Sequence, residues 1–513
     1  MCDQSPNAVT EVIVRMYKLG TGDCFALKFL DEEDSVFTML IDCGFWSAGR
    51  TYAQARKYIS DLKAFLGNEV DLLIVTHEHE DHVRGFQAGK KLFTENFTAK
   101  RVWMGWTEED GDPVVEEWKK DYGQKKRALA AAAMHLRKVV GTSAFEKQYK
   151  GSRHESQILG MRKGFSDELL RFSELHIGDD PEEFLSFSLD EYVNSLKGMA
   201  VVKNEIPKLE SIRCRKPGEL IDGDTELGLP GIRIYVLGPP MDYAAVKQEH
   251  GEEGESYEHN EDLSDFEFYS GAVMKAADDP QADGLATSAA PPFDTAFEDK
   301  PRSKIRSGYR KKENAWRTID HDWLFSGGAL ALRMNSLTNN LSLALAIEFK
   351  ESGKVLLFPG DAEFGSWKSW QRLSWTIDDK TVTANDLLNR AVFYKVAHHL
   401  SHNGTAKSVG LDQMTNPDLV AMATLDYDVI SSGWTSTMPN KALLQQLLEQ
   451  TKGRTMIMNE EGLYIDPKEK TKPWSERIRE FRNKMSLEEK ADFEDRLDDA
   501  DDGLFIEYRV KGF

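Results

Sequence analysis

The sequence predicts an α/β sandwich, on the evidence of three features. Four short apolar segments at 12–19, 24–30, 36–44 and 70–77 are separated by turn-like pieces such as GTGD and DEEDS, a pattern typical of strands. Between the third and the fourth, TYAQARKYISDLKAFLG at 51–67 has apolar residues at helical spacing and ends in glycine. The third feature is the return of strand-like segments from residue 231 onwards.

Those later segments begin with GIRIYVLGPP, a strand closed by prolines at 231–240. TNNLSLALAIEF (338–349), KVLLFPGDAEF (354–364), RAVFYKVAHHLSHNGT (390–405) and DYDVISSGW (426–434) follow, with a mainly polar connection between the last two. A helix, a short strand pair, a charged helix and a final strand are then expected at 438–450, 455–465, 473–499 and in GLFIEYRV.

Two stretches between these segments lack the strand pattern. We expect a helical insertion at 113–228, which is rich in helix formers. We expect a charged, partly irregular and partly disordered insertion at 250–322, where acidic, Ala/Asp/Pro-rich and basic blocks follow one another. Its basic stretch PRSKIRSGYRKK (301–312) is either a solvated surface segment, or a segment that forms a lid or contacts a phosphate backbone. The other expected parts are a first half of the sandwich (1–112), a return strand (229–249), a second half (323–468) and a C-terminal helix and strand (469–513).

The composition limits the classes of function. With 40% hydrophobic and 29% charged residues the chain is expected to fold as a globular protein, and no apolar stretch is long enough for a membrane helix. The N-terminus lacks a signal-peptide pattern and the four cysteines show no CxxC spacing, so we expect a cytoplasmic protein. A net charge of −21 argues against a general DNA-coating protein but does not exclude a nuclease.

The stretch DLLIVTHEHEDHVRGF places four metal-capable side chains at the exit of an apolar strand: His77, His79, Asp81 and His82. On an extended chain His77 and His79 point to the same face, and the other two fall in the turn or helix beyond. Imidazole and carboxylate donors suit Zn²⁺, Mn²⁺ or Fe. A single histidine is more often structural, but this arrangement predicts a metal site.

THEHEDH resembles the HxHxDH signature of the metallo-β-lactamase fold superfamily, an αββα sandwich with its metal site at one edge. The resemblance implies three further site positions. They are Asp42 in LIDCG, Asp361 in LLFPGDAE, and either His398 or His399 in KVAHHLSHNGT.

Four blocks narrow the resemblance to the hydrolase domain of ComEC-type DNA-uptake proteins and their soluble relatives. They are MYKLGTGDCFALKF, NNLSLALAIEFKESGKVLLFPGDAE, KVAHHLSHNGT and DVISSGW…MPNKALLQQL. The likeness covers approximately 10–110 and 325–465. Leu400 replaces the usual glycine after the histidine pair, and VLGPP stands where lactamase-type members have a further histidine. As in the ComEC-like subgroup, that missing ligand would leave one ion more open or more weakly held.

The resemblance implies two divalent ions, Zn or Mn, holding a bridging water whose pKa is lowered towards neutrality. His77 and His79 would hold one ion, Asp81 and His82 the other, and Asp361 would bridge. The late histidine completes the second site. We favour His399 over His398, because alternation along a strand lets only one of the two point inward.

Other residues have two interpretations each. Asp42 either orients a ligand imidazole or forms a strand-end turn. Asp23, in GTGD, reaches the site only if that turn lies at the metal edge; otherwise the glycines form a hairpin. Ser401 and His402 either join Asp81 in catalysis, by stabilising an oxyanion or protonating a leaving group, or cap the next helix.

The leading functional hypothesis is hydrolysis of phosphodiester bonds, by a nuclease or a nucleotide phosphodiesterase, with metal-activated hydroxide. One alternative is hydrolysis of another ester, an amide or a thioester by the same site, because one fold hosts many chemistries. Another is an effector or regulatory protein, for example in bacterial defence against foreign DNA, that binds a protein partner through residues 113–325.

Overall fold

The computed structural model describes a large part of the chain, interrupted by two long gaps and several short ones. The described residues are 8–32, 35–46, 51–116, 197–248, 251–252, 254–257, 336–401, 403–430, 438–466, 471–500 and 503–513. Most of the insertion predicted at 113–228, and nearly all of the one predicted at 250–322, therefore lie outside the described residues.

Eight strands form the first sheet, in the order β18-β19-β1-β2-β3-β4-β5-β6. They are β1 (Glu11–Tyr17), β2 (Phe25–Leu30), β3 (Ser35–Ile41), β4 (Glu69–Ile74), β5 (Thr98–Gly105), β6 (Arg213–Arg215), β18 (Leu497–Asp499) and β19 (Phe505–Lys511). The strands from β18 to β3 pair antiparallel, and β3, β4, β5 and β6 pair parallel.

Seven strands form the second sheet, in the order β15-β14-β13-β10-β9-β8-β7. They are β7 (Leu220–Asp222), β8 (Ile232–Val236), β9 (Leu345–Phe349), β10 (Val355–Phe358), β13 (Ala391–Lys395), β14 (Val420–Ala423) and β15 (Thr455–Ile457). Pairing is parallel from β10 to β15 and antiparallel from β7 to β10. Parallel strands are covered on both faces, and β10, β13 and β14 are buried along their whole length.

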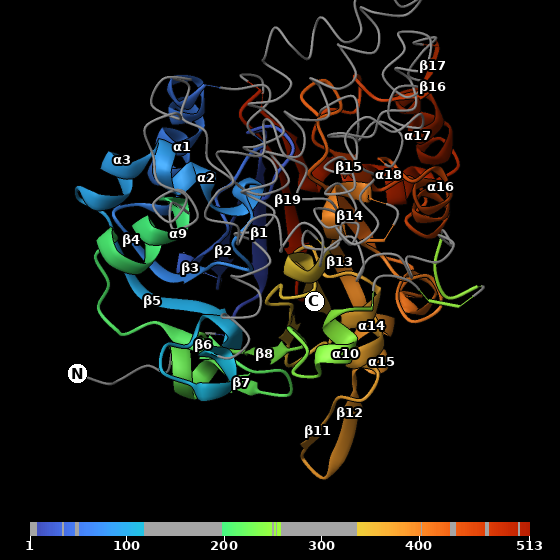
Figure 1. The fold of residues 1–513 in the computed structure, drawn as a ribbon. Helices are drawn as coiled ribbons and strands as arrows, with labels where there is room; N and C mark the ends of the chain where they lie inside the picture. The colour runs from blue at the N-terminus through green and yellow to red at the C-terminus, as the bar shows by residue number, and fades with distance from the viewer. Residues whose placement is uncertain are drawn as a thin grey trace, which may run out of the picture. The chain divides into compact units, whose positions relative to one another are not determined.

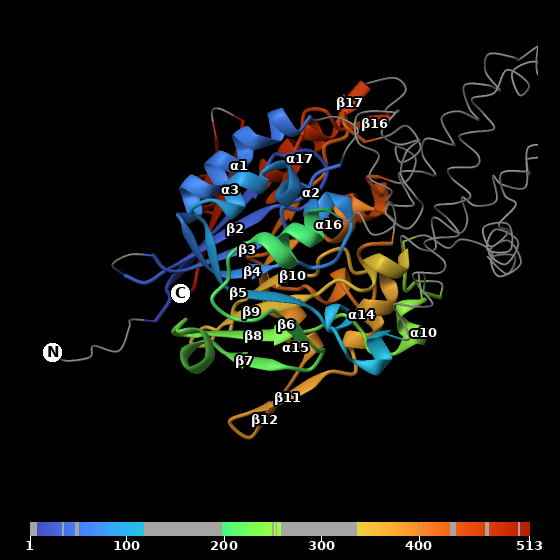
Figure 2. The ribbon, with the colours of Figure 1, turned by 60° about the vertical axis from the view of Figure 1, so that its left-hand side comes forward.

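The two sheets pack face to face around one hydrophobic core, to which strands of both contribute. The rings of Phe25 in β2 and Phe358 in β10 meet across this core, edge to face, with centroids 5.9 Å apart. Helices α1 (Tyr52–Leu66), α2 (Glu80–Ala88) and α3 (Lys90–Thr94) lie on the first sheet, and α14 (Phe364–Trp370) and α15 (Ala384–Asn389) on the second (Figures 1 and 2). The fold is the αββα sandwich that the sequence predicts.

The helix predicted at 51–67 is confirmed as α1. Thr51 and Gln54 form a capping box at its start, and Gly67, with φ 86°, ends it. Its buried face carries Ala55, Ile59, Leu62 and Leu66. The spacing of the apolar residues therefore placed this helix correctly.

Three segments differ from the sequence-based expectation. β6 and β7, each three residues long, fall in the range 113–228 that was predicted to be helical. β6 pairs with β5 and β7 with β8, and this pairing overrides a weak local sequence pattern. Of the strand predicted at 426–434, residues 426–430 form no strand and 431–434 lie outside the described residues. The strand of this region is β14, which begins six residues earlier, in the connection expected to be polar. The charged helix predicted at 473–499 is two helices, α17 (Trp474–Arg482) and α18 (Leu487–Arg496).

Shorter elements complete the described part. They are η1 (Trp106–Glu108), α9 (Lys197–Ala200), η2 (Val201–Glu205), η3 (Gly223–Leu227), α10 (Tyr243–Val246), β11 (Ser374–Ile377), β12 (Lys380–Thr383), η8 (Ala397–Leu400), η9 (Leu411–Gln413), α16 (Lys441–Gln450), β16 (Tyr464–Asp466) and β17 (Thr471–Pro473). Within the described residues, no helix has the length and apolar character needed to cross a membrane.

Candidate metal centre

Side chains from the loops after β4, β10 and β13 meet at one edge of the sandwich. β4 belongs to the first sheet and β10 and β13 to the second, so the convergence follows from the packing of the two sheets. All these side chains are buried, with exposures between 0% and 8%. They are His77, His79, Asp81, His82, Asp361 and His399.

The start of α2 holds two of them in place. His79 is the N-cap residue, so Asp81 and His82 fall in the first helical turn. The GTGD turn packs against this point: the backbone N–H of Asp23 donates to the carbonyl of Asp81 over 2.8 Å. A Cβ on Gly44 would lie 2.1 Å from the same carbonyl oxygen, and one on Gly22 2.6 Å from it. These glycines permit the close approach, and GTGD reaches the metal edge.

Four donor atoms converge on one point. They belong to Asp81, His82, Asp361 and His399, and they all lie within 4.8 Å of one another. The Nε2 atom of His82 is 3.0 Å from Oδ2 of Asp361. The Nε2 atom of His399 is 3.2 Å from the same oxygen and 3.1 Å from Oδ2 of Asp81. We call these four residues the four-donor cluster.

The four-donor cluster fits a divalent metal ion. Nε2 of His82 and Oδ2 of Asp361 are buried and lie 3.0 Å apart, but neither atom makes a hydrogen bond of normal geometry with any residue that the structure describes. Buried polar atoms without partners are costly, and two of them facing each other in a cluster of imidazoles and carboxylates are an arrangement that a cation would stabilise. Two nitrogen and two oxygen donors form a complete set for a four-coordinate ion such as Zn²⁺.

Asp42 orients the His82 imidazole. Its Oδ2 atom lies 2.8 Å from Nδ1 of His82, which leaves Nε2 of that ring directed into the cluster. Thr76 fixes Asp42 in turn, donating from its backbone N–H over 2.8 Å and from its hydroxyl over 2.6 Å. Burial alone would lower the pKa of His82, but the carboxylates of Asp361, Asp23 and Asp42 outweigh it and raise this pKa well above its ordinary value.

Thr424 and Asp23 orient the His399 imidazole. Nδ1 of His399 lies 2.7 Å from the Thr424 hydroxyl, which donates to Oδ1 of Asp23 over 2.7 Å. Burial lowers the pKa of His399, and the neighbouring carboxylates, Asp361 foremost, raise it to about 9. Sequence reasoning did not identify Thr424 as a site residue.

Lys395, which sequence reasoning also missed, is a buried cation beside the cluster. Its ammonium donates to Oδ1 of Asp361 over 3.0 Å, to the Gly360 carbonyl over 2.8 Å, and to Asp23. Burial lowers the pKa of Lys395, but the two carboxylates raise it above its usual value. The backbone N–H of His398 also donates to Oδ1 of Asp361, over 3.2 Å. A charged residue at the end of the apolar strand RAVFYK was the available signal.

His77 and His79 form a separate pair beside the four-donor cluster. Nε2 of His77 lies 3.0 Å from Nδ1 of His79. On its other side, Nδ1 of His77 lies 3.0 Å from the Thr76 hydroxyl and 3.2 Å from that of Ser342. Burial, then the positive charges of His82 and His79, lower the pKa of His77 well below its ordinary value. A neutral imidazole is the form that binds metals.

The two adjacent late histidines have different surroundings. His399 enters the four-donor cluster, whereas Nδ1 of His398 lies 3.5 Å from Glu363 and its Nε2 3.4 Å from the Asn339 amide. His399 was favoured over His398 on the ground that side chains alternate along a strand. That ground was wrong, because both histidines lie in the turn η8 after β13. His398, His399 and Leu400 have φ of 45°, 51° and 65°, a left-handed backbone that is costly for residues other than glycine.

The remaining predicted residues are less informative. Ser401 is buried, and its hydroxyl donates to the Asn403 side chain over 3.0 Å. His402 lies outside the described residues. No helix begins directly after Ser401 in the described residues, so the capping alternative for Ser401 gains no support.

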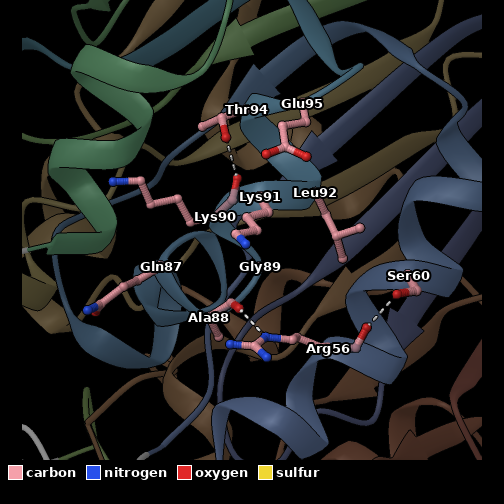
Figure 3. A pocket seen from close by; sticks show the side chains of 10 residues that line it. All are labelled: Arg56, Ser60, Gln87, Ala88, Gly89, Lys90, Lys91, Leu92, Thr94 and Glu95. Atoms are coloured by element: carbon pink, nitrogen blue, oxygen red, sulfur yellow. Dashed lines mark hydrogen bonds between the residues drawn. The ribbon is translucent and has the colours of Figure 1, made fainter.

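A cavity of about 630 Å³ lies elsewhere, between α1, α2 and α3 (Figure 3). Arg56 crosses it to donate to the Ala88 carbonyl over 3.1 Å, and Lys90 and Lys91 line it. None of the described residues that line this cavity is one of the predicted site residues. The cavity is therefore separate from the four-donor cluster.

Comparison with known families supports this location. Residues 29–112 match the family model of the metallo-beta-lactamase superfamily, a range that includes the HxHxDH motif but ends before Asp361 and His399. Comparisons with curated proteins and with solved structures gave no match. Members of this superfamily are generally hydrolytic enzymes that use divalent metal ions. The αββα sandwich, the match over 29–112 and the buried four-donor cluster together indicate a metal-dependent hydrolase.

Proposed function

We propose that this chain hydrolyses phosphodiester bonds, as a nuclease or a nucleotide phosphodiesterase, with Zn²⁺ or Mn²⁺ bound at the four-donor cluster. The observation that carries the proposal is the four-donor cluster, in which buried atoms of His82 and Asp361 lie 3.0 Å apart. The ComEC-like blocks that flank the cluster favour phosphodiesters over other substrates. Divalent ions suit that reaction because they both generate hydroxide near neutral pH and polarise phosphoryl oxygens.

The protein's own residues have distinct roles in this proposal. Asp81, His82, Asp361 and His399 would hold the ion. Behind them, Asp42 and Thr424 keep the two imidazoles turned so that both present Nε2 to the cluster.

Lys395 keeps Asp361 ionised. Burial raises the pKa of Asp361, but His399, Lys395 and His82 together lower it well below its ordinary value. The Asp361 carboxylate is therefore ionised at neutral pH, the form that can hold a metal ion. Because Lys395 engages Oδ1, the other oxygen of this carboxylate is free for the metal.

The net charge of −21 bears on the substrate. Long duplex DNA is repelled by an acidic protein, so nucleotides and short single strands are the favoured phosphodiesters. We expect weak cleavage of plasmid DNA beside efficient cleavage of smaller substrates.

The test is a substrate panel with the full-length protein loaded with Mn²⁺ or Zn²⁺. Single-stranded DNA, plasmid, cyclic dinucleotides and bis-p-nitrophenyl phosphate are compared with a thioester and a carboxylic ester. Asp361→Asn should reduce cleavage on the order of 100-fold or more, since it removes a ligand of the metal that activates water. Asp379→Asn, the same change in the exposed β11–β12 turn, serves as the matched control.

The outcomes separate the hypotheses. Cleavage of a carboxylic ester or thioester, with every phosphodiester left intact under each metal, would replace the proposed substrate class. A metal-loaded but inert protein that captures a partner only when residues 113–325 are present would favour the effector hypothesis.

A further inference from the structure

The cavity between α1, α2 and α3 has the size of a ligand pocket. Its volume is about 630 Å³, and pockets for small molecules in proteins usually have about 300–1,000 Å³. α2 connects this cavity to the metal donors: Asp81 and His82 lie in its first turn, and Gln87 and Ala88 at its end line the cavity. At a rise of 1.5 Å per residue, the two ends of this helix are about 12 Å apart. A ligand in the cavity would therefore lie beside the end of α2 that is remote from the metal donors.

The cavity has an excess of positive charge, although the chain as a whole carries −21. Of the described residues that line it, three are cations, Arg56, Lys90 and Lys91, and one is a carboxylate, Glu95. Lys63 adds a further cation at the rim, because its ammonium donates to the Glu95 carbonyl over 2.9 Å. Local positive charge on an acidic protein attracts anions to that place. The favoured ligand is therefore an anion.

Two of the cations are placed to bind a phosphate. In Figure 3 the Lys91 ammonium and the Arg56 guanidinium lie between the labelled side chains, whereas Lys90 extends away and pairs with Glu205 over 2.6 Å. Nε of Arg56 donates to the Ala88 carbonyl over 3.1 Å, which uses one of the five N–H donors of the guanidinium and fixes its position. The N–H groups on its terminal nitrogens match two oxygens of a phosphate, and Lys91 adds a second charge.

Other parts of the lining suit a sugar and a base. Glu95 is exposed and lies across the cavity from Arg56 (Figure 3). A carboxylate at this distance from the cations can accept hydrogen bonds from the hydroxyls of a ribose, as an acidic residue does in dinucleotide-binding folds. Leu92 is half-buried and gives the cavity an apolar surface for a base. The lining therefore combines the groups needed for the phosphate, the ribose and the base of a nucleotide.

We propose that the cavity between α1, α2 and α3 binds a ribonucleoside monophosphate, with its phosphate at Arg56 and Lys91 and its ribose at Glu95. The positive charges of the two cations balance the double negative charge of one phosphate monoester. The inference goes beyond the proposed function and does not depend on it, since none of the residues of the four-donor cluster lines the cavity.

The test measures binding rather than activity. Full-length protein is first stripped with a chelator, so that no metal ion at the strand ends can hold a phosphate. Isothermal titration calorimetry should then show binding of adenosine 5′-monophosphate, with inorganic phosphate as a competitor. Adenosine should bind about 10-fold more weakly or less, because it lacks the charged contacts with Arg56 and Lys91.

Variants assign the binding to this cavity. Lys91→Glu should weaken the binding of adenosine 5′-monophosphate by about 10-fold or more, because it replaces an attraction for the phosphate by a repulsion. Lys57→Glu is the matched control: Lys57 is exposed on α1 next to Arg56 but does not line the cavity, and the affinity should be retained. Glu95→Gln should weaken the binding of adenosine 5′-monophosphate but not that of its 2′,3′-dideoxy analogue. All three substituted positions are exposed, and circular dichroism checks that each variant is folded.

Two results would overturn the inference: no binding of adenosine 5′-monophosphate to the wild type, or equal affinities in Lys91→Glu and Lys57→Glu. A single-stranded oligonucleotide that binds through Lys91 more tightly than the monophosphate would also overturn it, since the cavity would then belong to a strand-binding surface. Failure to cleave any phosphodiester in the substrate panel would overturn the proposed function and leave this binding unaffected. The two failures are therefore distinguishable.

Discussion

Lys395 shows how much a single buried charge contributes to this centre. The Lys395 side chain is 1% exposed and contacts two buried carboxylates, those of Asp23 (2% exposed) and Asp361 (1% exposed). The two carboxylates contact different parts of the centre. Asp23 accepts from the Thr424 hydroxyl, and Asp361 contacts His82 and His399. Lys395 therefore connects the first sheet's loop to the second sheet's donors.

Lys395→Met should destabilise the folded chain by about 3–5 kcal/mol, because it leaves two buried carboxylates without their cation. The free energy of unfolding from denaturant titration measures this. Lys350→Met is the matched control: this lysine pairs with Asp222 and Asp224 at the surface and should cost about 1 kcal/mol or less. Equal losses in the two variants would show that the Lys395 contacts do not have the role assigned here.

Asp42→Asn tests the orientation of a ligand imidazole. An amide can place only one oxygen where Asp42 accepts from Thr76 and holds Nδ1 of His82. Metal affinity should fall by about 10–100-fold, as for other residues that support a ligand histidine. Asp71→Asn is the control, since Asp71 also accepts from a neighbouring strand, at Thr38, but lies outside the donor groups. Unchanged metal affinity in Asp42→Asn would refute the orienting role.

At the scale of elements, the position of α2 depends on a close backbone contact. A Cβ on Gly44 would lie 2.0 Å from the carbonyl carbon of Asp81, so Gly44→Ala forces the loop after β3 away from the start of α2. We expect a loss of about 3 kcal/mol, at the upper end of overpacking costs. Reduced metal content should accompany it, because Asp81 moves. Both are measurable on purified protein.

Gly67→Ala is the control for that experiment. Gly67 ends α1 with φ 86°, and a Cβ there would meet nothing within 4 Å. The substitution should cost about 1–3 kcal/mol of backbone strain, because Gly67 has ψ −165° as well as a positive φ, and should leave the metal content unchanged. If Gly67→Ala lowers metal content as much as Gly44→Ala does, the contact between Gly44 and Asp81 is not what positions the helix.

Helix α18 gives the chain a pH-dependent contribution to stability. Contact with the Lys452 ammonium, and then the backbone N–H of Ser486, lower the pKa of Glu489 to about 2. A carboxyl with a lowered pKa stabilises the folded state above its unfolded-state pKa, and this stabilisation disappears as the pH falls through the folded-state value. Glu489→Gln should therefore lower the melting temperature at neutral pH, with the difference vanishing between about pH 5 and pH 2.

Calorimetric scans across that pH range measure the difference. Glu488→Gln is the matched control, because Glu488 is exposed in the same first helical turn. It should show a smaller difference from the wild type. A Glu489→Gln difference that stays constant down to pH 2 would contradict the assignment.

Local patterns predicted those parts of the structure that depend on neighbours in sequence. The helix at 51–67 and the four donors between 77 and 82 were found in this way. Asp361 and His399 lie far along the chain and were reached only through a resemblance. Lys395 and Thr424 were missed, because their contacts exist only after two sheets have packed, and no spacing in the sequence encodes that packing.

At the scale of the whole molecule, β1 and β19, which lie near the two ends of the described chain, are paired neighbours in the first sheet. β19 lies between β18 and β1 and pairs with β1 over all seven residues, so the C-terminal segment is an inner strand. Ile506, Tyr508 and Val510 enter the core that both sheets share. The C-terminal helix and strand expected at 469–513 therefore include an inner strand of the first sheet.

Deletion of 497–513 should abolish cooperative unfolding and with it metal binding. The deletion exposes the backbone groups of β1 and opens the core between the sheets. Deletion of Phe513 alone, which is 58% exposed, is the control and should leave the thermal transition unchanged. Thermal unfolding followed by circular dichroism, with metal analysis of the soluble fraction, measures both. A truncated chain that still melts cooperatively and binds its ion would mean that the centre, built from loops between residues 23 and 424, forms without the closure of the first sheet.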